Sequence, residues 1–184
     1  IQFQRTHGLR VDGYAGPKTL AALGLQSPQR ASSMTQRSLV FISYSHEDTK
    51  WIEQLRVHLA PLERQGLVSR WDDSAITPGA QWRDEIAAAL ARAQVAVLLL
   101  SPNFMASRFI HEVELPTLLA ASKQEGLTVV PVVLRPCLLG ELSEYQSVNA
   151  LNKPLVDLTQ GDRDRMWIKV TEAITTALNN ERAA

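Results

Sequence analysis

The six residues VAVLLL (95–100) decide the fold that we expect for this chain. All six side chains are apolar, and no polar residue alternates with them. A short apolar run of this kind is typical of a β-strand that is buried on both faces, as in parallel sheets that carry helices on either side. We therefore expect an α/β domain that contains this strand.

Strands and helices are expected to alternate on both sides of this run. The other expected strands are LVFIS (39–43), LVSRW (67–71), LTVVPVVLR (127–135) and PLVDL (154–158), and helices are expected at 48–66, 82–93, within 101–119 and at 162–180. Pro131 indicates that its strand is an edge strand or carries a bulge. Alternation of this kind implies βαβ units, and five strands suit a flavodoxin-like, doubly wound parallel sheet.

The region before this domain has a different pattern. Residues 1–25 contain a glycine-rich turn and then a short helix that begins at Pro17 and ends at Gly24. Residues 26–37 are polar and lack periodicity, as a linker does. We expect a short N-terminal helical appendage (1–25), a linker (26–37) and an α/β domain (38–180).

The composition excludes several classes of protein. Lys plus Arg and Asp plus Glu number 19 each, so no net field favours nucleic acid or an anionic membrane. The longest strongly apolar run, at 95–100, is far too short to cross a bilayer. The single cysteine, Cys137, fits a reducing compartment and has no recognisable partner for nucleophilic chemistry. We expect a cytoplasmic protein without nucleic-acid or membrane partners.

In doubly wound sheets, ligands bind beyond the carboxyl ends of the strands. Aromatic, hydroxyl and carboxylate side chains converge at that edge, which suits a ligand with planar rings and ribose hydroxyls. They belong to four segments, one after each of the first four strands: 43–48, 71–73, 101–104 and 135–137.

Two glutamates follow the third strand in the segment SPNFMASRFIHEVELPTLL (101–119). Glu112 and Glu114 are two residues apart, and helical positions two apart cannot share one face. At most one of them therefore belongs to a site, and both could be ordinary surface charges. Apolar neighbours surround both, so periodicity does not decide between them. Pro116 leaves the helix start open, because it could be a first-turn proline or a kink.

Other site chemistries find less support in the sequence. The turn SYSHED (43–48) has none of the glycines of a dinucleotide-binding fingerprint, and no P-loop occurs. His46, Glu47 and Asp48 are contiguous, and contiguous residues rarely converge on one metal ion, so we expect no metal site and interpret Asp48 as a helix N-cap. A phosphoacceptor receiver domain would need an aspartate where this chain has Ser101.

The N-terminal segment resembles the C-terminal half of a peptidoglycan-binding repeat. The resemblance rests on the pair Phe3 and Gln4, followed by GLRVDGYAGPKT (8–19). It covers about half of such a module. We favour packing or assembly over cell-wall binding as the role of this segment.

Two longer segments resemble TIR (Toll/interleukin-1 receptor) domains, in the style of bacterial members. LVFISYSHED (39–48) is similar to their opening strand and turn. WDDSAITPGAQWRDEIAAALARAQVAVLLLSPNFMAS (71–107) is similar to their second box, connecting loop, second helix and third strand. The resemblance implies one of two functions, either an adaptor that self-associates or an enzyme that cleaves NAD⁺ to nicotinamide and ADP-ribose or a cyclic isomer.

The resemblance also implies the site residues. Enzymatic members use one glutamate directly before Leu or Ile, which selects Glu114 as catalytic and leaves Glu112 as an outer charge. Their aromatic residue about four positions earlier is Ile110 here, with Phe109 one position away. The implied substrate-binding residues are Phe41, Ser43, Tyr44, Ser45, Trp71, Asp72, Trp82, Ser101 and Phe104.

Three of these residues have an alternative structural role. Phe41 lies on a core strand and could serve packing alone. Trp82 could anchor the second helix to the sheet, and Ser101 could cap the turn that follows it.

One carboxylate is chemically sufficient for NAD⁺ cleavage. Ordinary glycosides need two, but nicotinamide already carries a positive charge and leaves as a neutral amine, so no general acid is required. A single carboxylate can stabilise the oxocarbenium-like ribose. We expect an NAD⁺ nucleosidase (NAD⁺ glycohydrolase) with NAD⁺ as substrate and no cofactor, active on self-assembly through the loop 74–80 and acting in bacterial antiphage immunity. Hydrolysis and cyclisation both stay open, and the alternative is a non-enzymatic TIR scaffold or adaptor.

Overall fold

The computed structural model describes residues 39–72, 82–124 and 126–180. The chain divides into two units, Ile1–Gln36 and Arg37–Ala184. The expected appendage (1–25), the expected linker (26–37) and the expected association loop (74–80) lie outside the described residues. The account below concerns the second unit.

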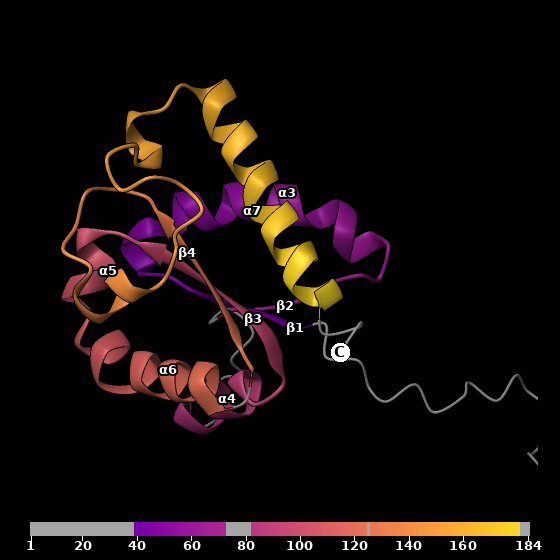
Figure 1. The fold of residues 1–184 in the computed structure, drawn as a ribbon, viewed down its shortest axis with the longest axis vertical. Coiled ribbons are helices and arrows are strands. Elements are labelled where there is room, and N and C mark those ends of the chain that lie inside the picture. Colours follow the sequence, from indigo (N-terminus) through magenta and orange to yellow (C-terminus); the bar gives the residue numbers. More distant parts are fainter. Residues whose placement is uncertain (1–38, 73–81, 125, 181–184) are drawn as a thin grey trace, which may run out of the picture. The chain divides into compact units, whose positions relative to one another are not determined.

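Four parallel strands form the sheet of this unit, in the order β2-β1-β3-β4 (Figure 1). The strands are β1 (Leu39–Ser43), β2 (Ser69–Trp71), β3 (Ala93–Leu100) and β4 (Thr128–Val133). All eight residues of β3 are buried, which confirms the interpretation of the apolar run. Ser43 lies opposite Leu98 in the β1–β3 register, so the end of β1 is fixed against the middle of the sheet.

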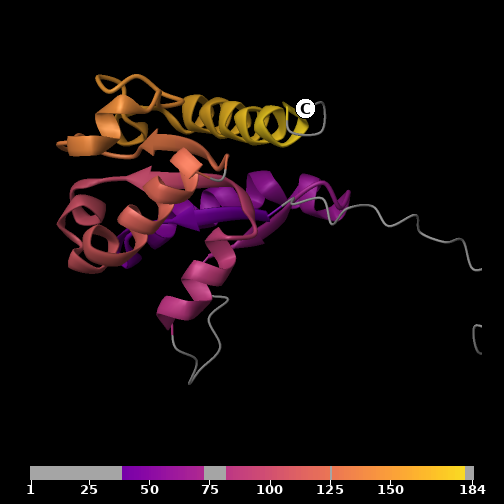
Figure 2. The same cartoon turned by 60° about the horizontal axis from the view of Figure 1, so that its bottom comes forward.

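Helices cover both faces of this sheet. On one face lie α3 (Thr49–Arg64) and α7 (Gln160–Asn180), and on the other lie α4 (Trp82–Leu90) and α6 (Leu115–Gln124) (Figures 1 and 2). Alternate strand residues supply the two cores: Val40 and Ile42 pack under α3 and α7, whereas Phe41 packs on the side of α4 and α6. The period of two along each strand therefore produces the two-layered helical cover.

The helix expected at 48–66 is present as α3 and is amphipathic. Trp51, Leu55 and Leu59 are buried along one side of α3. The helix ends three residues after Pro61, and Gly66 then adopts a φ of 70°, a conformation that glycine accepts without steric cost.

The expected fifth strand at 154–158 is wrong. Leu155–Asp157 form a 3₁₀ turn, η5, and the sheet of the described residues has four strands. A single hydrogen bond, from the Val156 N–H to the Leu134 carbonyl at 3.0 Å, stands where a strand ladder was expected. Leu155 of the segment PLVDL is buried in the core, but the segment does not extend the sheet.

Asn149 occupies the outer edge of β4 in place of a fifth strand. Its side-chain amide accepts a bond from the Val133 N–H at 2.9 Å and donates to the Val133 carbonyl at 2.9 Å and to the Lys153 carbonyl at 3.0 Å. The neighbouring Val148 N–H donates to the Pro131 carbonyl at 2.9 Å. Pro131 therefore does lie on an edge strand, as its missing N–H indicated.

Exchanging this amide for a carboxylate should destabilise the domain. In Asn149→Asp the donors to two carbonyls are lost and a charge is buried, so the free energy of unfolding should fall by about 3 kcal/mol at neutral pH. The loss should shrink as the pH is lowered, because a protonated carboxyl regains one donor. Urea denaturation measures both effects.

Asn152→Asp provides the matched control, since Asn152 is exposed and only three residues away. It should change the free energy of unfolding by less than about 0.5 kcal/mol. Equal losses in the two variants would contradict the role given to Asn149.

Candidate functional site

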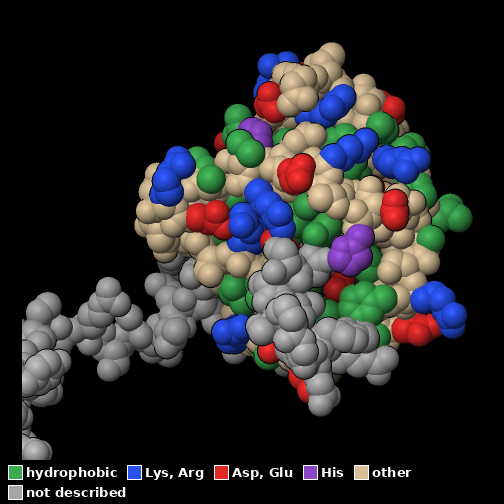
Figure 3. All heavy atoms as spheres, turned by 180° about the vertical axis from the view of Figure 1, so that it is seen from behind, with side chains coloured by type: hydrophobic (Ala, Val, Ile, Leu, Met, Phe, Trp, Pro, Cys, Tyr) green, Lys and Arg blue, Asp and Glu red, His purple; other side chains and the backbone are tan. Residues whose placement is uncertain are grey.

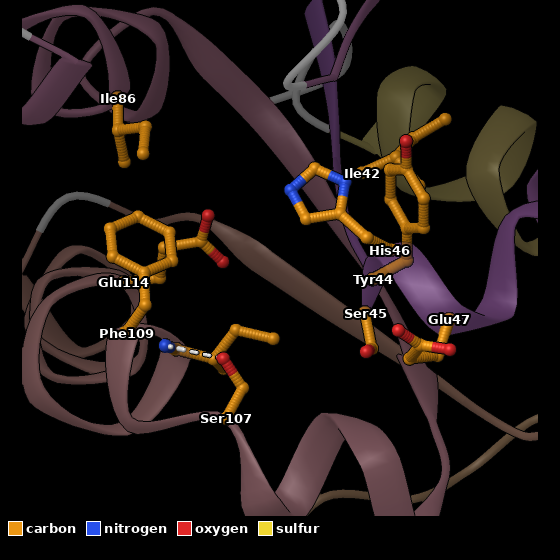
Figure 4. Close-up of a pocket in the computed structure, with 10 residues that line it drawn as sticks. Ile42, Tyr44, Ser45, His46, Glu47, Ile86, Ser107, Phe109 and Glu114 are labelled. Carbon is orange, nitrogen blue, oxygen red and sulfur yellow. Dashed lines mark hydrogen bonds between the residues drawn. The ribbon is translucent and has the colours of Figure 1, made fainter.

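A cavity of about 480 Å³ opens beyond the carboxyl end of β1. Figure 4 shows its two walls: Ile86, Phe109 and Glu114 lie on one side, and Tyr44, Ser45, His46 and Glu47 on the other. The first wall comes from α4 and from the segment after β3, and the second from the end of β1 and the short turn η1 (His46–Asp48). The complete described lining is Ile42, Tyr44, Ser45, His46, Glu47, Ile86, Ser107, Phe109, Ile110 and Glu114.

A π-helical turn presents Glu114 to this cavity. The turn, η3 (Ile110–Glu114), follows α5 (Pro102–Ala106) and runs directly into α6, and the Leu115 N–H donates to the Ile110 carbonyl five residues back. Pro116 explains the irregularity, because its ring clashes with the carbonyl four residues before it and its nitrogen cannot donate. Such single π turns are frequent at functional sites.

The π turn also brings Phe109 to the wall that carries Glu114. Residues five apart lie about 140° apart around a regular α-helix, so they would face different directions. In a π turn the backbone bond joins residues five apart, which places them near one face. Both Phe109 and Glu114 line the cavity as a result. Ile110, four residues before Glu114, lines the cavity as well.

The two glutamates differ strongly in environment. Glu114 is 7% exposed, and its Oε2 accepts a hydrogen bond of 2.5 Å from the Ser43 hydroxyl. Glu112 is exposed, and its carboxylate pairs at 3.5 Å with Arg108, which is more exposed still. The expectation that they face apart is confirmed, and Glu114 is the one that lines the cavity.

A second buried serine–carboxylate pair lies beside the first. Ser101 donates to Asp48 Oδ2 at 2.5 Å, and the Ser101 hydroxyl also accepts from the Phe104 N–H at 3.0 Å. Ser101 thus caps α5, one of its two expected roles. Asp48 does stand at the N-cap position of α3, but its side chain makes no cap bond, because it is turned inward to Ser101.

The remaining residues expected at the site are placed as follows. Tyr44 and Ser45 line the cavity with Glu114. Ser43, Phe41, Trp71, Asp72, Ser101 and Phe104 are buried and do not line it. Trp82 is the first residue of α4, and its side chain lies outside the described part of the structure.

Phe41, Trp71 and Asp72 have clear structural contacts. The rings of Phe41 and Trp71 stack with centroids 4.9 Å apart and an interplanar angle of 11°. Asp72 is buried and pairs with Arg56 at 2.8 Å and with Arg70 at 3.3 Å. These contacts tie β2 to β1 and α3, at one side of the sheet.

Sequence reasoning missed part of the lining. His46 and Glu47 belong to the segment 43–48 that was expected at this edge, but they are not among the substrate-binding residues that the resemblance implied. Among the described residues no cluster could hold a metal ion. Ile86 and Ser107 carry no signal of their own. Phe109 was expected only one position from the place of the family's aromatic residue, and its orientation depends on the π turn.

Surface charge and hydropathy agree with the composition. Acidic and basic side chains are interspersed over the face seen in Figure 3, without a large area of one sign. In the described ranges, no helix combines the length and the apolar character that a membrane crossing requires.

Cys137 has a raised pKa. Burial of the thiol is the larger cause, and the negative charge of Asp48 is the smaller. Both favour the neutral thiol over the thiolate, so the group is a poor nucleophile at neutral pH.

Two family models match the chain. One described as TIR domain matches residues 40–173, and one described as putative peptidoglycan binding domain matches residues 1–23. A protein of Sinorhizobium fredii described as "Uncharacterized protein y4lF" is 29% identical over 139 residues, which are 75% of this chain and 43% of that protein. The chain therefore spans less than half the length of this relative.

Solved structures of TIR domains are also similar. The TIR domain of the Toll-related receptor TRR-2 from Hydra magnipapillata superposes with a TM-score of 0.54 at 21% identity, covering 73% of this chain and 96% of that one. This likeness shows the fold. The TIR domains of the activated Roq1 resistosome match with a TM-score of 0.47 at 26% identity, covering 77% of this chain and 84% of that one.

The raised pKa of Cys137 predicts a shifted alkylation profile. The rate of reaction with iodoacetamide should rise with pH, and its midpoint should lie above that of the same chain unfolded in urea. Asp48→Asn should move the native midpoint part of the way back, because it removes the smaller cause. A native midpoint at or below the unfolded one would contradict this assignment.

Loss of the Ser101 hydroxyl should destabilise the domain. Ser101→Ala removes the cap of α5 and one partner of the buried Asp48 carboxylate, so the free energy of unfolding should fall by about 2 kcal/mol. Ser143→Ala is the control, because the Ser143 hydroxyl is exposed and bonds only the nearby Gly140 carbonyl among the contacts found. Thermal or urea unfolding compares the two, and equal stability would show that the Asp48 pair contributes nothing.

Proposed function

The chain belongs to the TIR domain family, and from this premise we propose that it is an NAD⁺ nucleosidase with Glu114 as its catalytic residue. The family includes enzymes that cleave NAD⁺. The observation that carries the proposal is the placement of Glu114, a nearly buried carboxylate on the wall of a cavity at the carboxyl edge of a parallel sheet. Ligands of doubly wound sheets bind at that edge.

The chemistry requires one correctly placed carboxylate. As the bond between nicotinamide and ribose breaks, positive charge moves from the ring to the ribose, and the ring leaves as a neutral amine. A carboxylate beside the ribose stabilises that developing charge, and more strongly where water is excluded. Two observations support Glu114 in this role: its side chain is only 7% exposed, and it lines the cavity.

The lining suits the nicotinamide half of the substrate. Phe109 on one wall and Tyr44 and His46 on the other offer ring surfaces to a planar heterocycle. Glu47 and Glu114 contribute negative charge, which favours the cationic pyridinium of NAD⁺ over a neutral ring. The Ser45 hydroxyl is available for hydrogen bonds to the ribose.

The products are nicotinamide and ADP-ribose or a cyclic isomer of it. Activity arises on self-association through the loop 74–80, and the setting is bacterial antiphage immunity. Membership of the family supports these finer statements.

Replacing Glu114 by Gln should strongly reduce turnover. Glu114→Gln keeps the size of the side chain but removes the charge, so kcat should fall by roughly 10²-fold to 10³-fold. The purified chain at high concentration is incubated with NAD⁺, and nicotinamide, ADP-ribose and its cyclic isomers are separated by chromatography.

Glu112→Gln is the matched control, because it makes the same change two residues away at an exposed position. Its kcat should stay within about twofold of the parent. Absence of turnover in the parent chain, under conditions of self-association, would overturn the enzyme and favour the scaffold. Equal activity of parent and Glu114→Gln would remove Glu114 from the catalytic role.

A further inference from the structure

The Ser43 hydroxyl lies against Glu114 rather than in the cavity. Its Oγ donates to Glu114 Oε2 at 2.5 Å across 71 residues of sequence. Ser43 is 3% exposed and is not among the described lining residues, which include its neighbours Ile42 and Tyr44. Resemblance assigned Ser43 to substrate binding, but its hydroxyl is already engaged by a carboxylate.

The sheet fixes the position of Ser43, whereas the Glu114 side chain that it binds is flexible. It is the last residue of β1, in register with Leu98 of β3, so its position is set by the sheet. Glu114 belongs to the π turn, outside the sheet, and a glutamate side chain has three rotatable bonds. A short bond from a fixed hydroxyl to one carboxylate oxygen removes much of this freedom.

The bond engages one of the two carboxylate oxygens of Glu114. Oε2 faces the sheet and accepts from Ser43, while the Glu114 side chain as a whole points across the cavity toward the wall formed by the end of β1 and η1 (Figure 4). The same side chain is one of those that line the cavity. A donor that stays in place before and during the reaction needs no reorganisation when charge develops on the ribose.

We infer that Ser43 is a positioning residue, which holds Glu114 in its productive orientation by hydrogen bonding to Oε2 and does not itself contact the substrate. The consequence for turnover rests on the proposed function. The contact itself does not, and it can be measured without substrate.

The chain contains a chemically matched comparison. Ser101 and Asp48 form an equivalent buried serine–carboxylate bond of 2.5 Å. It joins the same two segments but does not involve Glu114. Ser101→Ala therefore reproduces the loss of a buried hydroxyl and of stability. A change in the titration of Glu114 that appears in Ser43→Ala and not in Ser101→Ala is therefore caused by loss of the hydrogen bond between Ser43 and Glu114.

The first test follows the titration of Glu114 by NMR in the full chain labelled with ¹³C-glutamate, with Glu114→Gln used to assign the carboxyl resonance. Ser43 stabilises the charged carboxylate, so its removal in Ser43→Ala should raise the titration midpoint of Glu114 by about one pH unit. In Ser101→Ala the midpoint should stay within about 0.2 units of the parent. An unmoved midpoint in folded Ser43→Ala would overturn the inference.

The second test measures turnover against pH. In Ser43→Ala kcat should fall about 10-fold to 100-fold with KM changed less than about threefold, because orientation of the carboxylate matters most in the transition state. The acidic limb of the kcat/KM profile should move to higher pH with the NMR midpoint. The other titratable groups of the described lining, Tyr44, His46 and Glu47, remain in both proteins and do not account for such a shift.

Ser43→Thr restores the hydroxyl and should recover at least part of kcat and return the NMR midpoint toward the parent value. If the midpoint in Ser43→Thr stays at the Ser43→Ala value, the hydroxyl at this position does not position Glu114. The two failures are distinguishable. A moved midpoint without any turnover removes the proposed function and keeps the positioning contact, whereas turnover with an unmoved midpoint does the reverse.

Discussion

Two reciprocal serine–carboxylate bonds connect the end of β1 to the segment that follows β3. Ser43 of β1 donates to Glu114, and Ser101 after β3 donates to Asp48 after β1. Each segment therefore supplies one hydroxyl and one carboxylate, and all four groups are buried. Buried carboxylates are tolerated only where hydrogen-bond donors satisfy them. The segment after β1 and the segment after β3 can therefore pack together only when both bonds form. The cavity, whose walls are these same two segments, depends on that constraint.

The second determinant of the cavity is a backbone defect. Pro116 lies in the first turn of α6 and cannot donate a backbone hydrogen bond to the turn before it, and the chain has a π turn over Ile110–Glu114 there. The widened turn aligns Phe109 with Glu114, so the cavity wall that carries this carboxylate also has an aromatic surface. A proline that looked like a disturbance of the helix is thus part of the reason why a ring and a carboxylate face the same space.

The sequence predicted what depends on local pattern and missed what depends on distant partners. The run at 95–100, the stripe of α3 and the edge position of Pro131 were all readable, because burial and backbone chemistry leave a period or a missing donor in the sequence. PLVDL at 154–158 has the composition of a strand, but Asn149 already satisfies the outer edge of β4 at Val133, and nothing near 154 reveals this. Likewise, the separation of Glu112 from Glu114 followed from helix geometry, whereas the partner of Asp48 lies 53 residues away and the N-cap role expected for its side chain was not found.

The edge of β4 has a consequence for how copies of this chain can meet. An unprotected edge strand offers N–H and C=O groups to a strand from a second molecule. Here the Val133 groups are bound by the Asn149 amide, the Pro131 carbonyl by Val148, and the Leu134 carbonyl by Val156, while Pro131 has no N–H to offer. A strand from a second copy would have to displace its own chain before it could dock, so continuous sheets across copies are disfavoured on this side. At the β4 edge, side-chain surfaces rather than backbone ladders are left to join one copy to the next.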